Sequence, residues 1–132
     1  MSTALILFAH GARDPEWANS IRRVQAAIRS QVPAIPVELA FLEFMSPGLA
    51  ECAAQLILAG AAKIVVLPMF IARGGHLKRE VPEMLLSLQA SYPAVQFILG
   101  NAIGEHEIVV QAMADAALLV SGADLSPDCP TA

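Results

Sequence analysis

Charged residues, cysteines and long hydrophobic runs are all scarce in this sequence, and each scarcity excludes a class of protein. No apolar stretch approaches the roughly 18 to 20 residues that a membrane span requires, so we expect no membrane partner. Only 15% of the residues are charged and the formal net charge is −4, which predicts no nucleic-acid partner. The two cysteines, Cys52 in a helical pattern and Cys129 near the C-terminus, predict no structural disulfide. The first residues lack the charged leader of a signal peptide, which predicts a cytoplasmic location.

Hydrophobic residues, by contrast, make up 56% of the 132 residues. Such a composition excludes disorder and indicates either a heavily buried sheet or an apolar surface for association. A chain of this length buries roughly two thirds of the surface that its unfolded form exposes, which is enough for one core. We predict a single domain over residues 1–120, followed by a flexible tail at 121–132 that is rich in Gly, Pro and Asp.

Segments typical of strands and of helices alternate along the chain. The third apolar run shows no polar alternation, so we expect its strand to be covered on both faces. The sequence therefore predicts an α/β fold, a flavodoxin-like three-layer sandwich with a four-stranded parallel sheet and helices on both faces. The strands are expected at residues 4–9, 37–42, 63–70 and 95–99. The helices are expected at about 15–31, from Ser46-Pro47 to Gly60, from about 78–82 to Pro93 because Pro82 restricts the start, and at 107–120.

Three side chains of the types that bind metals follow predicted strands. His10 follows the first apolar run, Glu43 follows the second, and His76 lies in the loop after the third. Ligands of open parallel sheets bind at the carboxyl ends of the strands, and a flavodoxin-like order sets the first strand between the second and third. We therefore expect the three side chains to converge. Two imidazoles and a carboxylate suit Co, Fe, Ni or Zn and leave coordination positions open, and His also accepts a proton near pH 7.

Positive charge gathers around the same loops although the chain as a whole is acidic. Gly74 and Gly75, directly before His76, permit close approach of the backbone to a large ligand and offer amide donors. Arginine side chains bind carboxylates in a bidentate manner. These features predict an anionic ligand, and the cations concerned are Arg13, Arg73, Lys78 and Arg79.

Each of these features also has a purely structural alternative. The histidines are equally able to serve as hydrogen-bonded loop residues, Glu43 as a cap of the following helix, and Lys78 and Arg79 as an exposed first helical turn. His106 has no partner motif and is not assigned to the site. A phosphate-ester hydrolase is a further alternative, because residues 9–13 resemble the signature of histidine phosphatases, although the arginine that precedes the histidine there is missing.

Three segments together resemble the small sirohydrochlorin chelatases: LILFAHGARDPEW at 5–17, VELAFLEFMSP at 37–47 and IVVLPMFIARGGHLKREVP at 64–82. The resemblance extends to about Val120 and excludes the tail. It implies a chelatase-like form of the predicted fold, a homodimer, and insertion of a divalent metal into sirohydrochlorin with release of two ring protons, on the way to cobalamin or sirohaem. Co²⁺ is the first candidate for the metal and Fe²⁺ the next, and Ni²⁺ accepts the same ligands. The metal is then a substrate, and no permanent cofactor is expected.

The resemblance also implies roles for individual residues. His10 matches the histidine that binds the metal and accepts a pyrrole proton, His76 matches the second metal-binding histidine, and Glu43 matches the acidic residue that faces the macrocycle. Arg13 is expected to bind peripheral carboxylates of the tetrapyrrole. The loop that lines the macrocycle corresponds to Ile71, Ala72, Arg73, Gly74 and Gly75.

One departure from the family pattern is visible. Many relatives have HGSRD where this chain has HGARD, so Ala12 removes a hydroxyl and any hydrogen bond that it made. The histidine-rich stretch of some relatives is also missing. A metal or tetrapyrrole carrier that uses the same pocket without inserting the metal is the non-enzymatic alternative.

Overall fold

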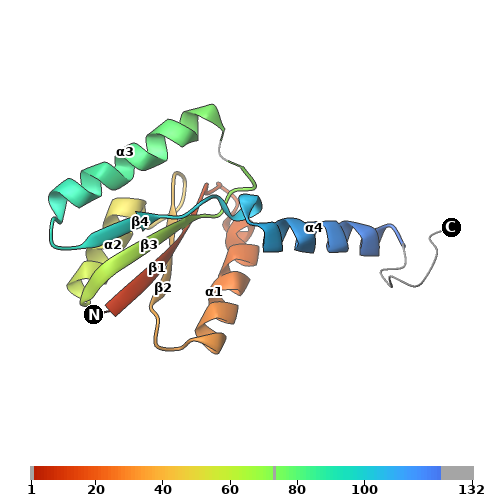
Figure 1. Ribbon diagram of the computed structural model, residues 1–132, viewed down its shortest axis with the longest axis horizontal. Coiled ribbons are helices and arrows are strands. Elements are labelled where there is room, and N and C mark those ends of the chain that lie inside the picture. Colours follow the sequence, from red (N-terminus) through yellow and green to blue (C-terminus); the bar gives the residue numbers. More distant parts are fainter. Residues whose placement is uncertain (1, 73, 123–132) are drawn as a thin grey trace.

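A computed structural model describes residues 2–72 and 74–122, apart from the side chain of His76. Four parallel strands form one sheet in the order β2-β1-β3-β4 (Figure 1). The first strand therefore lies between the second and third, which confirms the predicted flavodoxin-like order. The strands are β1 (Ser2–Ala9), β2 (Val37–Phe41), β3 (Ala61–Pro68) and β4 (Gln96–Leu99), each within two residues of the predicted bounds.

Helices lie on both faces of the sheet, as the sequence predicts. The main core packs α2 and α3 against the face of the sheet that carries Ile6, Phe8 and Ile64. A smaller cluster of Ala9, Ala18 and Phe41 lies on the opposite face, next to α1. The helical segments are η1 (Pro15–Ala18), α1 (Asn19–Gln31), α2 (Leu49–Leu58), α3 (Gly75–Ser91), η2 (Ile103–Glu105) and α4 (Glu107–Val120).

The predicted start of the second helix at Ser46-Pro47 is wrong. The carbonyl oxygen of Pro47 accepts a hydrogen bond from the Phe41 amide at 2.9 Å, so this segment pairs with the end of β2. The helix begins at Leu49 with Gly48 as its N-cap, and no side chain caps it. A Ser-Pro pair that looks like a cap and first turn thus serves the sheet edge instead.

The third helix begins earlier than Pro82 led us to predict. It starts at Gly75, and its first turn is closed by a 3.0 Å hydrogen bond from the Lys78 amide to the Gly74 carbonyl. Pro82 lies inside the helix, where it removes one backbone donor. Burial of Val81 and Leu85 against the sheet outweighs that loss.

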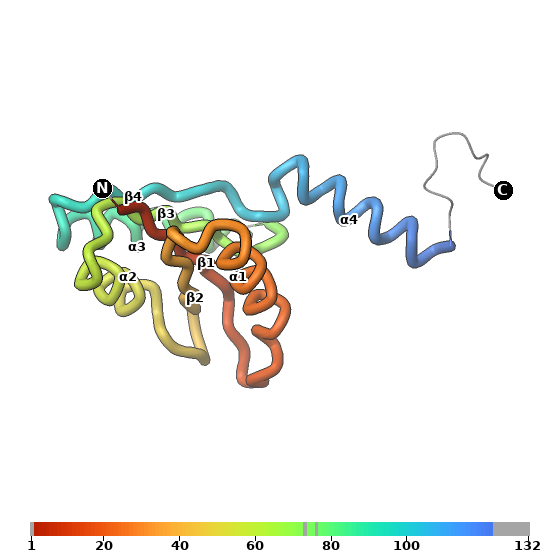
Figure 2. Tube along the Cα trace, turned by 90° about the horizontal axis from the view of Figure 1, so that it is seen from below, coloured from red at the N-terminus to blue at the C-terminus, as the bar shows by residue number. Residues whose placement is uncertain are grey.

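The last helix has the predicted bounds but an unexpected position. Figures 1 and 2 show α4 projecting from the end of the body, and none of its residues is buried. Among the described residues, no helix is both long and apolar enough to span a membrane. The predicted domain of residues 1–120 stays a prediction, and residues 123–132 of the predicted tail lie outside the described part.

Candidate active site

Backbone hydrogen bonds hold His10 beside Glu43 just beyond the strands. Parallel pairing of β1 with β2 ends at Ala9 and Phe41. Beyond that point the Leu42 amide donates to the Ala9 carbonyl at 2.9 Å, and the Glu43 amide donates to the His10 carbonyl at 3.0 Å. The backbone hydrogen bonds thus continue beyond the carboxyl ends of β1 and β2. They bring the side chains of His10 and Glu43, far apart in sequence, together as predicted.

Gly11 makes this close approach possible. Its φ is +90°, which an L side chain rarely adopts. A Cβ at this position would also overlap the backbone oxygen of Glu43. The glycine that follows His10 in the sequence is therefore required by the backbone of the loop that carries Glu43.

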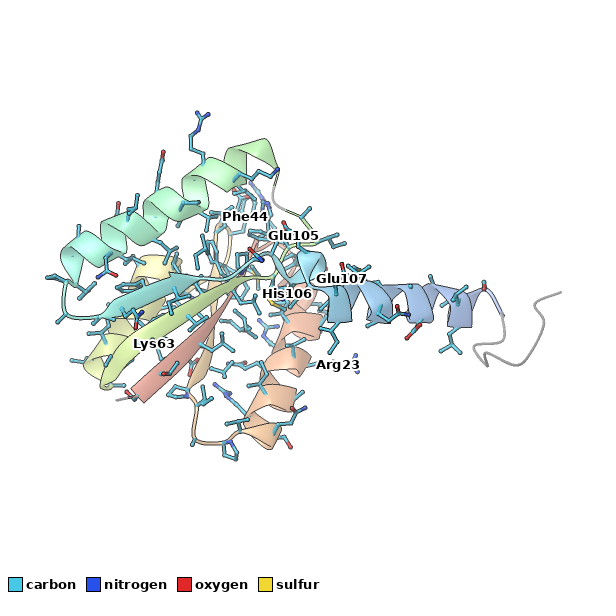
Figure 3. The ribbon with its side chains drawn as sticks, viewed as in Figure 1. Arg23, Phe44, Lys63, Glu105, His106 and Glu107 are labelled. Atoms are coloured by element: carbon cyan, nitrogen blue, oxygen red, sulfur yellow. The ribbon has the colours of Figure 1, made fainter. Side chains whose placement is uncertain are left out.

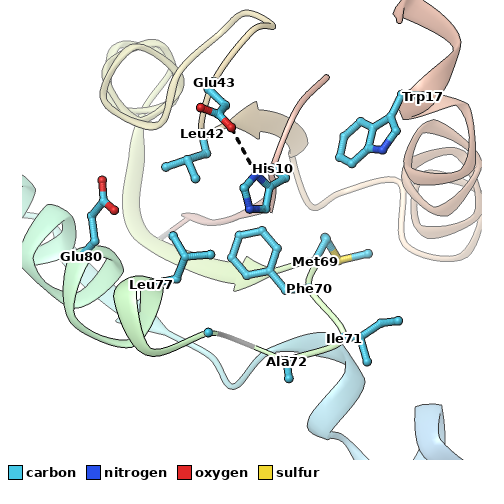
Figure 4. A pocket seen from close by; sticks show the side chains of 11 residues that line it. His10, Trp17, Leu42, Glu43, Met69, Phe70, Ile71, Ala72, Leu77 and Glu80 are labelled. Atoms are coloured by element: carbon cyan, nitrogen blue, oxygen red, sulfur yellow. Dashed lines mark ion pairs between the residues drawn. The ribbon is translucent and has the colours of Figure 1, made fainter. Parts of the chain in front are cut away.

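The imidazole of His10 lies between a carboxylate and an aromatic ring (Figure 4). Its Nδ1 is 3.6 Å from Glu43 Oε1, and both side chains are about half exposed, at 48% and 50%. This distance is longer than a hydrogen bond and lies within the range of an ion pair when the imidazole is protonated. The Phe70 ring lies on another side, with its centroid 5.5 Å from that of the imidazole.

His10 and Glu43 belong to the wall of a pocket of about 800 Å³. Its volume lies within the range of about 300 to 1,000 Å³ that is usual for small-molecule sites. Apolar side chains from separate elements form much of the wall, so a large flat ligand with an apolar face would fit. Besides these two residues the lining comprises Trp17, Leu42, Met69, Phe70, Ile71, Ala72, Gly74, Leu77 and Glu80 (Figure 4).

The loop between β3 and α3 forms one side of the pocket, as the sequence predicts. Ile71, Ala72 and Gly74 line it. Gly104 supports this loop from behind: its amide donates to the Phe70 carbonyl at 3.0 Å, and a Cβ on it would overlap the backbone of Ile71. Gly75, the remaining glycine of the predicted loop, begins α3 and is absent from the described lining.

The predicted pair of metal-binding histidines is not tested by this structure. The backbone of His76 belongs to the first turn of α3, while its side chain, like all of Arg73, lies outside the described residues. Within the described part of the chain, no three His, Cys, Asp or Glu side chains gather closely enough to hold a metal ion. The assignment of His10 and His76 as metal ligands stays a prediction.

Arg13 lies near this site but does not line the pocket. Its guanidinium carbon is 4.9 Å from the centroid of the Phe44 ring, a cation–π contact. Phe44 has a φ of 66°, which is rare for a residue other than glycine, and its side chain is 57% exposed. Sequence reasoning missed Phe44, and its place directly after Glu43 was the one signal that pointed to it.

Several pocket residues were also missed because their patterns indicate other roles. Trp17 falls within the helix expected at about 15–31 and Met69 within the strand expected at 63–70, yet both line the pocket. His106 lies outside the pocket lining, and its Nε2 is 3.2 Å from the Asn101 carbonyl oxygen. That His106 does not belong to the site stays a prediction.

Comparison with known sequences gives a consistent result. A family model described as CbiX matches residues 4–118. The chain is 32% identical over 104 residues to a sirohydrochlorin cobaltochelatase of Priestia megaterium, a match that covers 79% of this chain and 34% of the relative. Matches to the first curated relatives span between 34% and 57% of their length, so this chain corresponds to only part of those proteins.

Solved structures resemble the fold over nearly its whole length. A putative cobalamin biosynthesis CbiX protein of Marinobacter aquaeolei VT8 superimposes with a TM-score of 0.78 and 26% identity, covering 91% of this chain and 98% of the other. The sirohydrochlorin chelatase SirB of Bacillus subtilis subspecies spizizenii, in complex with cobalt, gives 0.77 and 25%, covering 91% of this chain and 51% of the other. The fold class inferred from the sequence is confirmed.

Proposed function

Since the chain belongs to the CbiX family, we propose that it is a sirohydrochlorin chelatase, which inserts a divalent metal into the tetrapyrrole sirohydrochlorin. The observation that carries the proposal is the contact of His10 with Glu43 at the wall of a large, mainly apolar pocket. The pocket suits a flat macrocycle, and the imidazole–carboxylate pair suits the removal of its protons. Co²⁺ is the first candidate for the metal, since similar proteins are named sirohydrochlorin cobaltochelatases, and Fe²⁺ is the next.

Metal insertion requires proton removal, and His10 is the proposed base. A divalent metal that enters the ring replaces two N–H protons, so two protons leave for each metal bound. His10 accepts them in turn and passes each to solvent, to which its half-exposed ring has access. Glu43, at 3.6 Å, stabilises the imidazolium while it carries the proton. Phe70 limits the positions that the imidazole ring can take.

The metal is proposed to arrive through His10 and His76, as the family resemblance implies. Two imidazoles with open positions hold a borderline divalent metal less firmly than a closed four-ligand site does. Such incomplete coordination favours transfer of the metal to the four ring nitrogens. This part of the proposal is supported by the position of the His76 backbone in the first turn of α3, directly after the pocket loop.

The substrate's carboxylates are proposed to bind at the margin of the pocket. Arg13 is exposed there, and its contact with Phe44 leaves the edge of the guanidinium able to donate hydrogen bonds. Arg73 and the backbone amides of residues 71–75 are the other proposed donors. The predicted homodimer, the cytoplasmic location and the lack of a permanent cofactor belong to the same proposal.

An insertion assay tests the proposal directly. Purified protein is mixed anaerobically with sirohydrochlorin and Co²⁺ or Fe²⁺, and the visible spectrum reports metal uptake. We expect the wild type to accelerate insertion and His10→Ala to lose about 100-fold or more of the rate, the usual contribution of a general base. Glu43→Gln, which keeps the shape and removes the charge, is expected to lose about tenfold. The matched control is His106→Ala, which changes a histidine away from the pocket and should keep the wild-type rate.

Two results would contradict chelatase activity. One is a wild-type rate equal to the spontaneous rate, and the other is a full rate in His10→Ala. Tight binding of sirohydrochlorin without metal uptake would indicate the carrier instead. Competition among Co²⁺, Fe²⁺ and Ni²⁺ in the same assay identifies the preferred metal.

A further inference from the structure

The loop between β2 and α2 contains a backbone conformation that its residue type rarely adopts. Phe44, in this loop at the carboxyl ends of the strands (Figure 3), has a φ of 66°. It is the one residue other than glycine with a positive φ in the part of the chain that the structure describes. A residue with a Cβ is strained in this region, and strained residues concentrate at functional sites. Phe44 directly follows Glu43, so the strain lies next to the proposed active site.

A hydrogen bond shows that Phe44 is the central residue of a γ-turn. The Met45 amide donates to the Glu43 carbonyl at 2.8 Å, two residues back along the chain. A γ-turn with a positive φ at its central residue is the rare and strained form of this turn. The chain thus bends sharply within three residues, directly after the carboxylate that contacts His10.

The two residues that flank Phe44 are each held by another part of the protein. The Glu43 amide donates to the His10 carbonyl at 3.0 Å, and the Glu43 carbonyl lies so close to Gly11 that no Cβ fits there. Met45 packs against the smaller hydrophobic cluster next to α1. In an extended segment, side chains two residues apart point to the same side. The γ-turn instead allows Glu43 to line the pocket while Met45 packs on the cluster.

The side chain of Phe44 holds the turn from outside. Its exposed ring contacts the guanidinium of Arg13, whose carbon is 4.9 Å from the ring centroid. Arg13 belongs to the loop that follows His10, so the two loops meet both at the Glu43 carbonyl and at the Phe44 ring. The Cβ of Phe44 also restricts the backbone to few conformations, which a glycine would not do. Both effects reduce the freedom of Glu43.

We propose that Phe44 is a positioning residue, whose strained turn fixes the Glu43 carboxylate beside the His10 imidazole. This inference rests on the proposed function, in which Glu43 stabilises the imidazolium of His10. Phe44 is absent from the described lining of the pocket, so it acts through Glu43 and not on the substrate. A glycine would adopt the same turn without strain. Phenylalanine at this position therefore lowers stability and makes Glu43 more rigid.

Two substitutions of Phe44 separate rigidity from stability. Phe44→Ala removes the ring and keeps the Cβ, while Phe44→Gly removes both. Phe44→Gly should melt about 3 °C or more above Phe44→Ala, because a positive φ strains alanine. Its kcat for metal insertion should nevertheless be about threefold lower than that of Phe44→Ala, with KM unchanged, because Glu43 moves more freely while the pocket wall stays intact. A merely structural residue would change the rate and the melting temperature in the same direction.

A double substitution tests whether Phe44 acts through Glu43. In the Glu43→Gln background, Phe44→Gly should lower kcat by less than about twofold, since the carboxylate that it positions is already gone. The matched control is Ala34→Gly in the turn between α1 and β2, where Ala34 is exposed and its φ is not positive. This variant should melt about 2 °C below the wild type and keep the wild-type kcat.

Amide hydrogen exchange, followed by NMR, tests the turn without substrate. The Glu43 amide, which is bonded to the His10 carbonyl, should exchange about fivefold faster or more in Phe44→Gly than in Phe44→Ala. The Leu42 amide, which is bonded to the Ala9 carbonyl, should exchange at the same rate in both variants. A difference confined to Glu43 would show that the turn, and not the end of β2, has been loosened.

Three results would overturn the proposal. They are a wild-type kcat in Phe44→Gly, a loss of rate that adds in full to that of Glu43→Gln, and equal exchange of the Glu43 amide in Phe44→Gly and Phe44→Ala. A Phe44→Gly protein that melts below Phe44→Ala would contradict the strain itself. A wild type that inserts no metal would contradict the chelatase activity alone, because the order of melting and the amide exchange still decide the role of the turn.

Discussion

At the scale of single residues, Gly11 determines whether His10 and Glu43 can meet. Its φ of +90° and the lack of room for a Cβ beside the Glu43 carbonyl both require glycine. We expect Gly11→Ala to lower the free energy of unfolding by at least about 2 kcal/mol and to move Glu43 away from His10. Urea denaturation measures the first effect, and the loss of insertion rate measures the second.

Gly75→Ala is the matched control for that substitution. A Cβ on Gly75 would meet no atom within 4 Å, so its free energy of unfolding should stay within about 0.5 kcal/mol of the wild type. Equal stability of the two variants would show that the close approach at Gly11 has been misjudged.

Cys52 gives a second prediction at the residue scale. Burial, with smaller contributions from the charges of Glu38 and Glu51, raises the pKa of its thiol from 9.0 to about 12. Between these values the unfolded chain has lost the thiol proton and the folded protein has kept it, so a rise in pH favours unfolding. The free energy of unfolding should therefore fall as the pH rises from about 9 to about 12. Urea denaturation of the wild type and of Cys52→Ala over this range isolates the effect of the thiol. The free energy of unfolding of the wild type, relative to that of the variant, should fall as the pH rises.

At the scale of elements, local signals identified the helices and strands better than their ends. Periodicity located every element of the sheet and all four long helices. The predicted starts of α3, based on Pro82, and of α2, based on Ser46-Pro47, were wrong. In both cases contacts with other segments of the chain decide where the helix begins. A helix start depends on which carbonyl accepts each free amide, and neighbouring elements decide that.

Pro82 also carries a prediction about α3. Pro82→Ala restores an amide that can donate to the Lys78 carbonyl, one turn earlier in the helix. We expect the free energy of unfolding to rise by about 1 to 2 kcal/mol, the gain of the helix less the added entropy of the unfolded chain. Thermal and urea denaturation measure the change. Glu83→Ala, an exposed neighbour, should leave stability nearly unchanged, and a fall in stability of Pro82→Ala would contradict the argument.

At the scale of the whole molecule, the exposed apolar side chains of α4 connect stability with association, because such a helix gains from a partner. If the proposed homodimer forms, the melting temperature depends on protein concentration. We expect a tenfold rise in concentration to increase it by about 2 °C or more. Differential scanning calorimetry of the wild type over that range provides the test. A wild type that melts at one temperature over the whole range would contradict the homodimer.

The sequence by itself determined the α/β class, the alternation of elements, the family resemblance and the meeting of His10 with Glu43. These follow from local periodicity and from the rule that the ends of parallel strands share one edge. Only the tertiary structure decided which apolar side chains form the pocket wall, because Trp17, Phe70 and Leu77 come from separate segments and each also suits a core. It also decided the direction of α4. That direction depends on how the turn at Gly104 packs against Phe70 and Ile71, a contact between distant segments that no local pattern records.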